Sequence, residues 1–348
     1  MRVFREHLIL KGFTVKQALE LLNNLAPDPI LFVVDQDEKL IGSLTDGDIR
    51  RGLLNNFTIE SKIDDIIQPN PRFIRKGEND IQKIISYREG NFRILPVVDE
   101  NMHVLNVINF RNIKSYLPID AVIMAGGRGQ RLKPLTDNTP KPLLKVGEKP
   151  IIEYNIDRLA SYGIDDFWVS INYLGEQIQR YLGNGEKKSI NIDYILEKEA
   201  LGTIGAVSNV SNFEHDYILV TNSDLLTTID YENFFLDFIN QDADFAVLTI
   251  PYKVNIPYAV LETKDGRIKS FKEKPTYTYY SNGGMYLMKK EVIKYIPKNS
   301  FFNSTDLMEQ LIKHDYKVIS YPFSGYWLDI GKHEDFEKAQ ADIQNLKL

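Results

Sequence analysis

A basic, glycine-rich segment follows a short apolar run, and its residue types are those that bind phosphate. The segment reads Ala125-Gly126-Gly127-Arg128-Gly129-Gln130-Arg131. Glycines directly after a strand let backbone N–H groups approach an anion closely. Residues 126–149 also hold six basic and two acidic side chains, which gives a local charge of +4. The segment therefore predicts a binding site for a nucleoside triphosphate.

Two common phosphate-binding motifs do not fit this loop. A Walker A motif requires Gly-Lys followed by Ser or Thr, and no such sequence follows Gly129. A dinucleotide-binding fingerprint opens directly into a helix, which Pro134 and Pro140 would break. We therefore expect neither a P-loop NTPase nor a dinucleotide-binding enzyme.

Carboxylates stand in two segments that are far apart in the sequence. Asp224 follows the apolar run 217–220, and the carboxyl end of a strand in an α/β sheet is a typical place for a magnesium ligand. Asp329 lies in the segment Tyr326-Trp327-Leu328-Asp329-Ile330-Gly331, so only the fold could bring the two carboxylates together. The chain has no cysteine, and its five histidines lie outside these motifs, so covalent catalysis has no candidate residue.

The elements that must position these residues alternate between strand-like and helix-like stretches. Apolar runs at 121–124, 166–171 and 217–220 predict strands, and the stretch 150–159 is amphipathic. This alternation predicts an α/β domain over 118–348 with a doubly wound, mostly parallel sheet. Ligands of such sheets lie at the carboxyl ends of the strands, where the glycine-rich loop is placed.

Residues 1–117 contain an internal repeat with an offset of 64 residues. The run Ile-Leu-Phe-Val-Val-Asp at 30–35 aligns with Ile-Leu-Pro-Val-Val-Asp at 94–99. Each copy predicts a helix, a strand, an acidic turn, a strand and a closing helix. A unit of about 60 residues is marginal alone, so we expect the two copies to pack together.

The charge distribution bounds the classes of partner. Residues 1–117 carry 16 basic and 16 acidic side chains, so the net charge of −6 lies entirely in 118–348. This balance argues against nucleic-acid binding, which rests on broad basic surfaces. No apolar run approaches the ~20 residues that span a bilayer, and the N-terminus has no apolar signal region. We expect a cytoplasmic homo-oligomer with no membrane partner.

The glycine-rich string resembles the signature of sugar-1-phosphate nucleotidyltransferases, and further motifs over 119–348 follow in the order of that family. The resemblance implies a Rossmann-like (GT-A-like) fold and transfer of a nucleoside monophosphate from a nucleoside triphosphate to a sugar 1-phosphate. Pyrophosphate would be released. The resemblance also implies Mg²⁺, held by Asp224 and Asp329. A non-catalytic sensor of nucleotide-sugars is an alternative, against which the intact set of catalytic residues argues.

The resemblance assigns the nucleotide contacts to two segments. Arg131 would grip the triphosphate, Lys141 would lie near the reacting phosphates, and three backbone positions would face the nucleotide. These positions are Ala125, Gly126 and Gly127. In the segment 196–206, Gly202 would allow close approach to the base, and Thr203 would offer hydroxyl and backbone contacts.

The residue Glu197 bears on the choice of base. Many uridylyl and thymidylyl members of the family carry glutamine there, and an amide suits a pyrimidine edge. An ionised carboxylate only accepts hydrogen bonds, which matches the two adjacent donors of guanine. We therefore favour GTP, and guanylyltransferases fused to a CBS module, such as those for glucosamine or mannose 1-phosphate, resemble the whole chain most. The alternative is a uridylyl or thymidylyl transferase that acts on a hexose 1-phosphate.

The sugar contacts are implied by the same resemblance. Lys274 would neutralise the sugar phosphate as part of the catalytic set, and Glu273 would accept hydrogen bonds from sugar hydroxyls. Asn282 belongs to an Asn-x-Gly strand that lines the sugar pocket. Ala259 stands where many members have a glycine whose backbone faces the sugar, so the identity of the sugar stays open.

The repeat in 1–117 resembles a tandem CBS module, which binds adenine nucleotides between its two halves. The most specific match is Thr45-Asp46-Gly47-Asp48. The resemblance implies that Thr45 contacts phosphate and Asp48 contacts ribose hydroxyls. The second copy has Asn109 and Asn112 at these positions, and asparagine offers no carboxylate to a diol. The module would either sense an adenine nucleotide or serve only for assembly.

Overall fold

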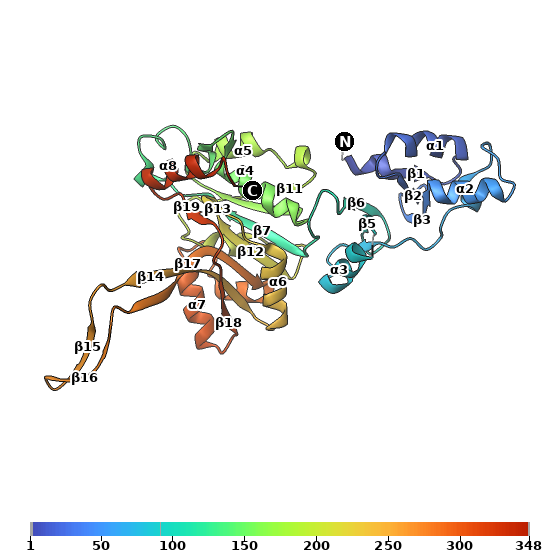
Figure 1. The fold of residues 1–348 in the computed structure, drawn as a ribbon. Coiled ribbons are helices and arrows are strands. Elements are labelled where there is room, and N and C mark those ends of the chain that lie inside the picture. The colour runs from blue at the N-terminus through green and yellow to red at the C-terminus, as the bar shows by residue number, and fades with distance from the viewer. Residues whose placement is uncertain (1–2, 91, 347–348) are drawn as a thin grey trace.

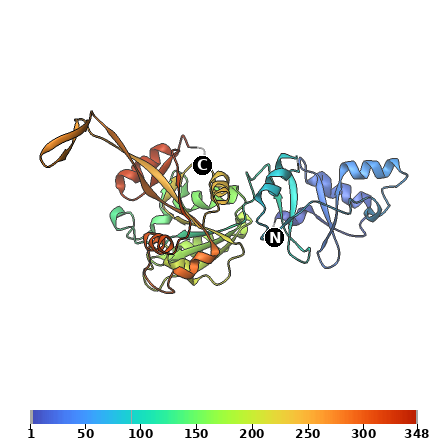
Figure 2. The ribbon, with the colours of Figure 1, turned by 90° about the horizontal axis from the view of Figure 1, so that it is seen from below.

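The computed structural model describes residues 3–90 and 92–346 and shows an N-terminal pair of repeats beside a larger α/β part (Figures 1 and 2). Each repeat has a three-stranded sheet whose first pair of strands is parallel and whose second pair is antiparallel. The first repeat contains β1 (Leu8–Leu10), α1 (Val15–Asn24), β2 (Ile30–Val34), β3 (Leu40–Thr45) and α2 (Asp46–Leu54). The second contains β4 (Ile74–Arg75), α3 (Ile81–Glu89), β5 (Ile94–Val98) and β6 (Val104–Asn109). Phe32, Leu40, Ile94 and Val104 share one apolar cluster, so the two copies pack together as expected.

The second repeat lacks the closing helix that the sequence predicts, because segment 110–118 is turn and coil. Two backbone N–H groups of this segment instead donate to carbonyl oxygens of the last residue of α4 (Ile151–Ser161) and of the residue after it. Lys114 N–H donates to Ser161 O at 2.6 Å, and Leu117 N–H donates to Tyr162 O at 3.1 Å. Tertiary contacts therefore take the hydrogen bonds that a helix would have used.

A seven-stranded sheet forms the centre of the larger part, in the order β11-β10-β7-β12-β17-β14-β18. Every neighbouring pair is parallel except the two pairs made by β17. The strands are β7 (Ile119–Met124), β10 (Asp166–Ile171), β11 (Asn191–Leu196), β12 (Tyr217–Asn222), β14 (Phe245–Asn255), β17 (Thr276–Lys289) and β18 (Val318–Pro322). The mostly parallel α/β sheet predicted from the sequence is confirmed.

Helices cover both faces of this sheet. On β7, Ala121 and Ile123 belong to the apolar cluster that includes side chains of α4, α5 and α6, whereas Val122 belongs to the cluster of α7. This is the doubly wound arrangement. The remaining helices are α5 (Gly175–Leu182), α6 (Tyr231–Asn240), α7 (Ser304–Lys313) and α8 (His333–Asp342). In residues 3–90 and 92–346, no helix has the length and apolar character to cross a membrane.

A two-stranded ribbon projects from the body in both views (Figures 1 and 2). It consists of the outer halves of β14 and β17 together with the hairpin of β15 (Val260–Lys264) and β16 (Arg267–Lys272). We call residues 251–281 the arm. The structure describes all of the arm, and none of its residues is buried.

The second repeat docks at the amino ends of the sheet strands. Lys76 Nζ lies 2.7 Å from Asp166 Oδ2 at the start of β10. Arg88 donates two hydrogen bonds to the Glu232 carboxylate on α6, at 2.8 and 3.0 Å. A single apolar cluster also runs from Ile81 and Leu95 of the second repeat into the core of the larger part. The second repeat is therefore packed as part of that core.

Candidate active site

A cleft of about 460 Å³ opens where β7, β11 and β12 end. Its position at the carboxyl ends of parallel strands is the one expected for a ligand site in such a sheet. Eight residues that the sequence predicts for the site line it: Gly126, Gly127, Arg131, Lys141, Glu197, Gly202, Thr203 and Asp224.

The glycine-rich loop has little room for side chains. A Cβ on Gly126 would lie 2.9 Å from Glu197 Oε1, and one on Gly129, where φ is +59°, would lie 2.9 Å from Thr136 Cγ2. Among the described residues, no acceptor takes the N–H of Gly126 or Gly127. These two donors are therefore free for an anion. Ala125 differs from the expectation, because it is buried and its N–H donates to Ser170 O at 2.9 Å.

The two carboxylates meet through a short antiparallel pair, β13 (Leu225–Thr227) with β19 (Trp327–Asp329). Their register sets Leu225 opposite Asp329, and Ile330 N–H donates to Asp224 O at 3.1 Å. Lys141 lies in the 3₁₀ turn Lys141–Leu143 and forms an ion pair with Asp224. Its Nζ atom lies 3.9 Å from Asp329 Oδ1. The fold thus brings together three residues that the sequence places in three separate motifs.

The carboxylate pair has the character of a cation site. Burial and then the charge of Asp224 raise the pKa of Asp329 to about 6, while Lys141 and Arg131 oppose the rise. The Oδ1 atoms of Asp224 and Asp329 are buried and have no hydrogen-bond partner among residues 3–90 and 92–346. Two carboxylate oxygens of this kind fit Mg²⁺, which takes one or two carboxylates and fills its remaining positions with phosphates and water.

Glu197 is a buried pocket residue, with 9% of its surface exposed. Its carboxylate accepts hydrogen bonds from the Ser170 hydroxyl and, at 2.9 Å, from Leu201 N–H. A carboxylate has about four acceptor positions, so each oxygen can still accept a further donor from a ligand. The described residues place no lysine, arginine or histidine in an ion pair with it.

Gly202 and Thr203 also line the cleft. Gly202 has φ +80°, and a Cβ there would lie 2.5 Å from Phe302 O, so the position accepts only glycine. The Thr203 hydroxyl accepts a hydrogen bond from Ser304 N–H at 2.9 Å, at the start of α7. In this structure the hydroxyl of Thr203 is therefore used to hold α7.

The residues expected to contact the sugar are not in the cleft lining. Ala259, Glu273 and Lys274 lie on the arm, where all three are exposed. The reason is that β14 and β17 stay paired beyond the sheet, from Thr249–Asn282 to Asn255–Thr276, and carry these residues away from the body. Asn282 stands at the root of the arm, where its Oδ1 accepts hydrogen bonds from Gly284 N–H at 2.9 Å and Tyr286 OH at 3.0 Å.

Nine further lining residues are not among the predicted site residues, and they include Gln130, Asn222 and Phe301. Gln130 and Asn222 stand next to predicted motifs, and Asn222 ends β12 at the same sheet edge as Asp224. That position could have been found from the rule that ligands gather at strand ends. Phe301 belongs to no motif, and its side chain is largely exposed at the cleft. Only the fold reveals it.

In the first repeat, Thr45 and Asp48 form a capping box at the start of α2. The Asp48 carboxylate accepts from Thr45 N–H at 2.9 Å, from the Thr45 hydroxyl at 2.6 Å and from Gln68 Nε2 at 2.9 Å. Burial alone would raise the pKa of Asp48, but these bonds and Arg51 outweigh burial and hold it below its usual value. The structure thus gives both residues a helix-capping role.

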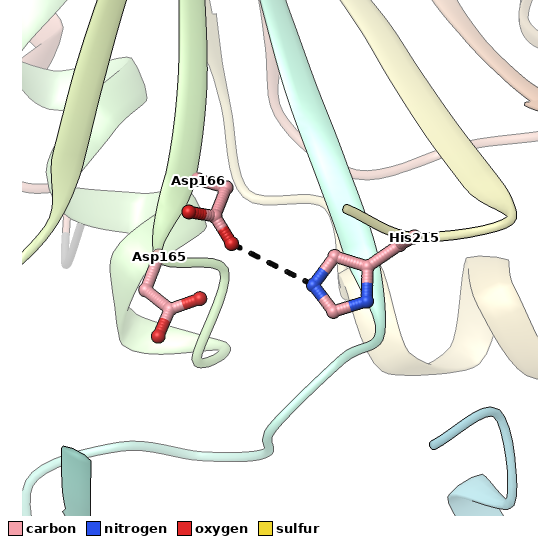
Figure 3. A group of neighbouring side chains, drawn as sticks. All are labelled: Asp165, Asp166 and His215. Atoms are coloured by element: carbon pink, nitrogen blue, oxygen red, sulfur yellow. Dashed lines mark ion pairs between the residues drawn. The ribbon is translucent and has the colours of Figure 1, made fainter. Parts of the chain in front are cut away.

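A second acidic cluster lies at the opposite end of the sheet, where the second repeat docks. Asp165, Asp166 and His215 point toward one another there (Figure 3), close enough to share a metal ion. The ammonium of Lys76 already pairs with Asp166. Burial acts to raise the pKa of Asp166, but His215 and Lys76 lower it overall, whereas burial raises the pKa of Asp165. This cluster belongs to the junction and not to the cleft.

The cleft combines free loop amides, a lysine and paired carboxylates on an α/β sheet, which is a site built to handle phosphate groups. The sequence profile of the nucleotidyl transferase family matches residues 120–345, and the profile of the CBS domain matches residues 9–55. The chain belongs to the nucleotidyl transferase family. Its resemblance to nucleotidyltransferases joined to a CBS domain is confirmed.

Individual relatives act on different nucleotides. The chain is 32% identical over 232 residues to the D-glycero-alpha-D-manno-heptose 1-phosphate guanylyltransferase of Aneurinibacillus thermoaerophilus. The aligned region spans 65% of this chain and 99% of that enzyme. It is 28% identical over 253 residues to the UTP–glucose-1-phosphate uridylyltransferase of Synechocystis sp., spanning 66% of this chain and 65% of that enzyme. HddC from Yersinia pseudotuberculosis, solved in complex with GMP-PN, matches 64% of this chain and 99% of its own at 26% identity, with a TM-score of 0.50.

Proposed function

We propose that the chain transfers a nucleoside monophosphate from a nucleoside triphosphate, with GTP favoured, to a sugar 1-phosphate and releases pyrophosphate. The observation that carries the proposal is the register of β13 and β19, which sets Asp224 and Asp329 beside Lys141 at the glycine-rich loop. The names of the relatives support the sugar 1-phosphate as the acceptor.

The chemistry needs positioning and charge stabilisation more than proton transfer. The attacking phosphate oxygen is already an anion, so no general base is required. Arg131 and Lys141 offset the charge of two polyanions in one cleft, and the N–H groups of Gly126 and Gly127 donate to phosphate oxygens. A Mg²⁺ ion held by Asp224 and Asp329 would neutralise charge on the phosphates. The residues assigned to this work are Arg131, Lys141, Asp224, Asp329 and, from the arm, Lys274.

The preference for GTP rests on Glu197, whose carboxylate lines the cleft and retains acceptor capacity for guanine N–H groups. The uridylyltransferase among the relatives keeps uridylyl or thymidylyl transfer as the second candidate. We expect Glu197→Gln to lower the kcat/KM ratio of GTP over UTP about tenfold, since one acceptor is exchanged for a donor. Ser211→Ala, a change at an exposed residue away from the cleft, is the control. An unchanged ratio would show that Glu197 does not determine the preference for GTP.

We further propose that residues 1–117 form a tandem CBS regulatory module that binds an adenine nucleotide. Thr45 and Asp48 would have to leave their capping box to contact it, so a second location is worth testing. Asn109 and Asn112, the equivalent positions of the second repeat, line a cavity of about 350 Å³ at the junction with the larger part. Titration of AMP, ADP and ATP while turnover and thermal stability are measured tests the proposal. Flat responses would leave assembly as the role of the module.

The experiment that tests the main proposal is a matrix of nucleoside triphosphates against sugar 1-phosphates, read by pyrophosphate release. We expect release with GTP and at least one sugar 1-phosphate, and loss of release when EDTA removes Mg²⁺. Release with UTP or dTTP alone would favour the second candidate. No release from any pair would overturn catalysis and favour a protein that only binds nucleotide-sugars.

A further inference from the structure

The arm is an unusually apolar surface for a segment that projects into solvent. Seven of its large apolar side chains are between 52% and 76% exposed. They are Tyr252, Tyr258, Leu261, Ile268, Phe271, Tyr279 and Tyr280. Contiguous apolar patches of this kind on a protein surface mark sites of interaction.

The pairing of the strands gathers these side chains into patches. Tyr252 lies directly opposite Tyr279, and Leu261 lies directly opposite Phe271, so each pair shares one face of the ribbon. A ribbon of two strands is marginally stable in water, and its outer edges offer unpaired N–H and C=O groups. Another surface is therefore needed to cover the arm.

The body of the same chain is poorly placed to supply that surface. The ladder between β14 and β17 continues without a hinge from Thr249–Asn282 to Asn255–Thr276, and Ile256 N–H donates to Pro275 O at 3.1 Å beyond it. Folding the arm back onto its own cleft would require a bend at the irregularity between Val247 and Thr249, at the root of the arm. Docking onto a second chain leaves the ladder intact.

Charge makes a second copy of this chain a suitable partner. The arm holds six basic and three acidic side chains, a net charge of +3, so the rest of 118–348 carries −9. The cleft also presents an apolar side chain, because Phe301 lines it and is 65% exposed. A basic, aromatic arm and an acidic body with an apolar side chain at its cleft are complementary.

The cleft itself is incomplete for its proposed substrates. Its lining holds two cations, Arg131 and Lys141, and two carboxylates, Glu197 and Asp224. A nucleoside triphosphate and a sugar 1-phosphate together carry far more negative charge than this set offsets. The arm carries a lysine and a glutamate, Lys274 and Glu273, which are exposed and form no ion pair in the part of the chain that is described.

We propose that the arm of one chain packs over the cleft of a second copy, against Phe301, and that its Lys274 and Glu273 complete the partner's site. The role given to Lys274 and Glu273 rests on the proposed function, whereas the docking of the arm does not. The exchange is reciprocal, so it closes as a two-fold dimer.

Cross-linking tests the docking directly, because the chain has no cysteine of its own. A Phe271→Cys chain and a Phe301→Cys chain, co-expressed with different tags and purified through both, are treated with a short bismaleimide. We expect a covalent dimer that carries both tags. Leu54→Cys, in the exposed helix α2, replaces Phe271→Cys as the matched control and should give no link.

Two outcomes would overturn the docking. The double variant Phe271→Cys/Phe301→Cys could form a link within one chain, which would show that the arm folds onto its own cleft. The unmodified chain could sediment as a monomer at micromolar concentration while the mixture of the Phe271→Cys and Phe301→Cys chains gives no linked dimer, which would show that the arm stays unpartnered. Both measurements are independent of enzymatic activity.

Complementation tests the contribution of the arm to the partner's site. Lys274→Ala and Lys141→Ala chains, each inactive alone, are co-expressed as a mixed population. If the arm acts on its partner, half of the dimers regain one of two sites, and activity returns to about a quarter of the wild-type value. Activity no higher than that of either variant alone would overturn the role of Lys274 in the partner. If the wild-type chain releases no pyrophosphate from any substrate pair, the proposed function fails while cross-linking still decides the docking.

Discussion

The two ends of the central sheet use their charged groups differently, although the same strands connect them. At the carboxyl end, Arg131 and Lys141 line a cleft together with the carboxylates of Glu197 and Asp224. At the amino end, Asp120, Asp166 and their neighbours gather acidic groups, and the cation that meets them is Lys76 of the second repeat. One end is thus built to receive a ligand, and the other is built to hold the N-terminal module.

The comparison also shows how short the path between the two ends is. β7 begins with Ile119 and Asp120 at the junction and ends with Met124 at the cleft. At about 3.3 Å per residue, this is a distance of roughly 17 Å. Changes at the two ends therefore distinguish local from transmitted effects.

The largest effect is expected at the carboxyl end. Asp224→Asn removes a carboxylate charge from the candidate metal site and the partner of Lys141. We expect kcat/KM for pyrophosphate release to fall about 1000-fold or more, because charge stabilisation at the reacting phosphates is the main contribution to catalysis. Asp137→Asn, an exposed carboxylate after the same loop, is the matched control. Activity of Asp224→Asn within tenfold of wild type would show that Asp224 is not needed for catalysis.

The next effect is expected at the amino end. Lys76→Met leaves Asp165 and Asp166 partly buried without their cation, and breaking a buried pair from one side costs about 3 kcal/mol. Urea unfolding of the full chain, followed at its first transition, measures the loss. Lys11→Met, an exposed lysine of the first repeat, should change stability little. Equal stability of the two variants would contradict the assigned role of Lys76, and a loss of activity in Lys76→Met alone would show that the ends communicate.

A smaller effect follows from Asp120. Burial, and to a lesser degree Asp166, raises the pKa of Asp120 to about 6, although His215 opposes the rise. The folded state thus binds this proton more tightly than the unfolded state, so its contribution to stability is present below about pH 4 and is lost as pH rises through 6. We expect Asp120→Asn to stabilise the chain by about 2 kcal/mol at pH 8.

The same variant supplies its own control when the pH is lowered. At pH 4 the wild-type carboxyl is already protonated in the folded state, so the difference between Asp120→Asn and wild type should nearly vanish. Thermal unfolding of both chains at pH 8 and pH 4 measures it. A gain of equal size at both pH values would show that the buried charge is not its cause.

The smallest effect is expected away from both ends, in the first repeat. Thr45→Ala removes the hydroxyl of the capping box on α2, and loss of such a cap costs about 1 kcal/mol. Thr58→Ala, an exposed change in the same repeat, is the comparison. Hydrogen exchange of α2 should rise in Thr45→Ala alone. Unaltered exchange would show that the cap adds little to the helix.

Much of the site could be predicted from the sequence, because its residues follow rules of local structure. Glycines after a strand and a carboxylate near a strand end lie at one sheet edge in any parallel sheet, which placed Gly126 and Asp224 together. The meeting of Asp224 with Asp329 depends on the pairing of β13 with β19 over a long sequence separation. No local pattern encodes that pairing, so it could be expected only from the family resemblance.

The errors have identifiable physical causes. The prediction of a helix after β6 was wrong. The repeat pattern cannot show that the backbone N–H groups of that segment donate to Ser161 O and Tyr162 O instead. The position of Lys274 outside the cleft lining could not be predicted for a related reason. Its motif is local, but its position depends on how far β14 and β17 remain paired. The capping box of Thr45 and Asp48, in contrast, is readable from the Thr-x-x-Asp spacing.

The apolar cluster that joins the second repeat to the larger part has a consequence for how the chain can be divided. A cut before β7 would strip Tyr116 and Leu117 from the surface that buries them, together with the side chains of α3 and β5. A cut near residue 70, between the repeats, would keep the first repeat's own cluster but would separate Phe32 and Leu40 from Ile94 and Val104 of the second repeat. The cut before β7 therefore divides the core of the larger part, whereas the cut near residue 70 divides the contact between the repeats and leaves the second repeat joined to the transferase sheet.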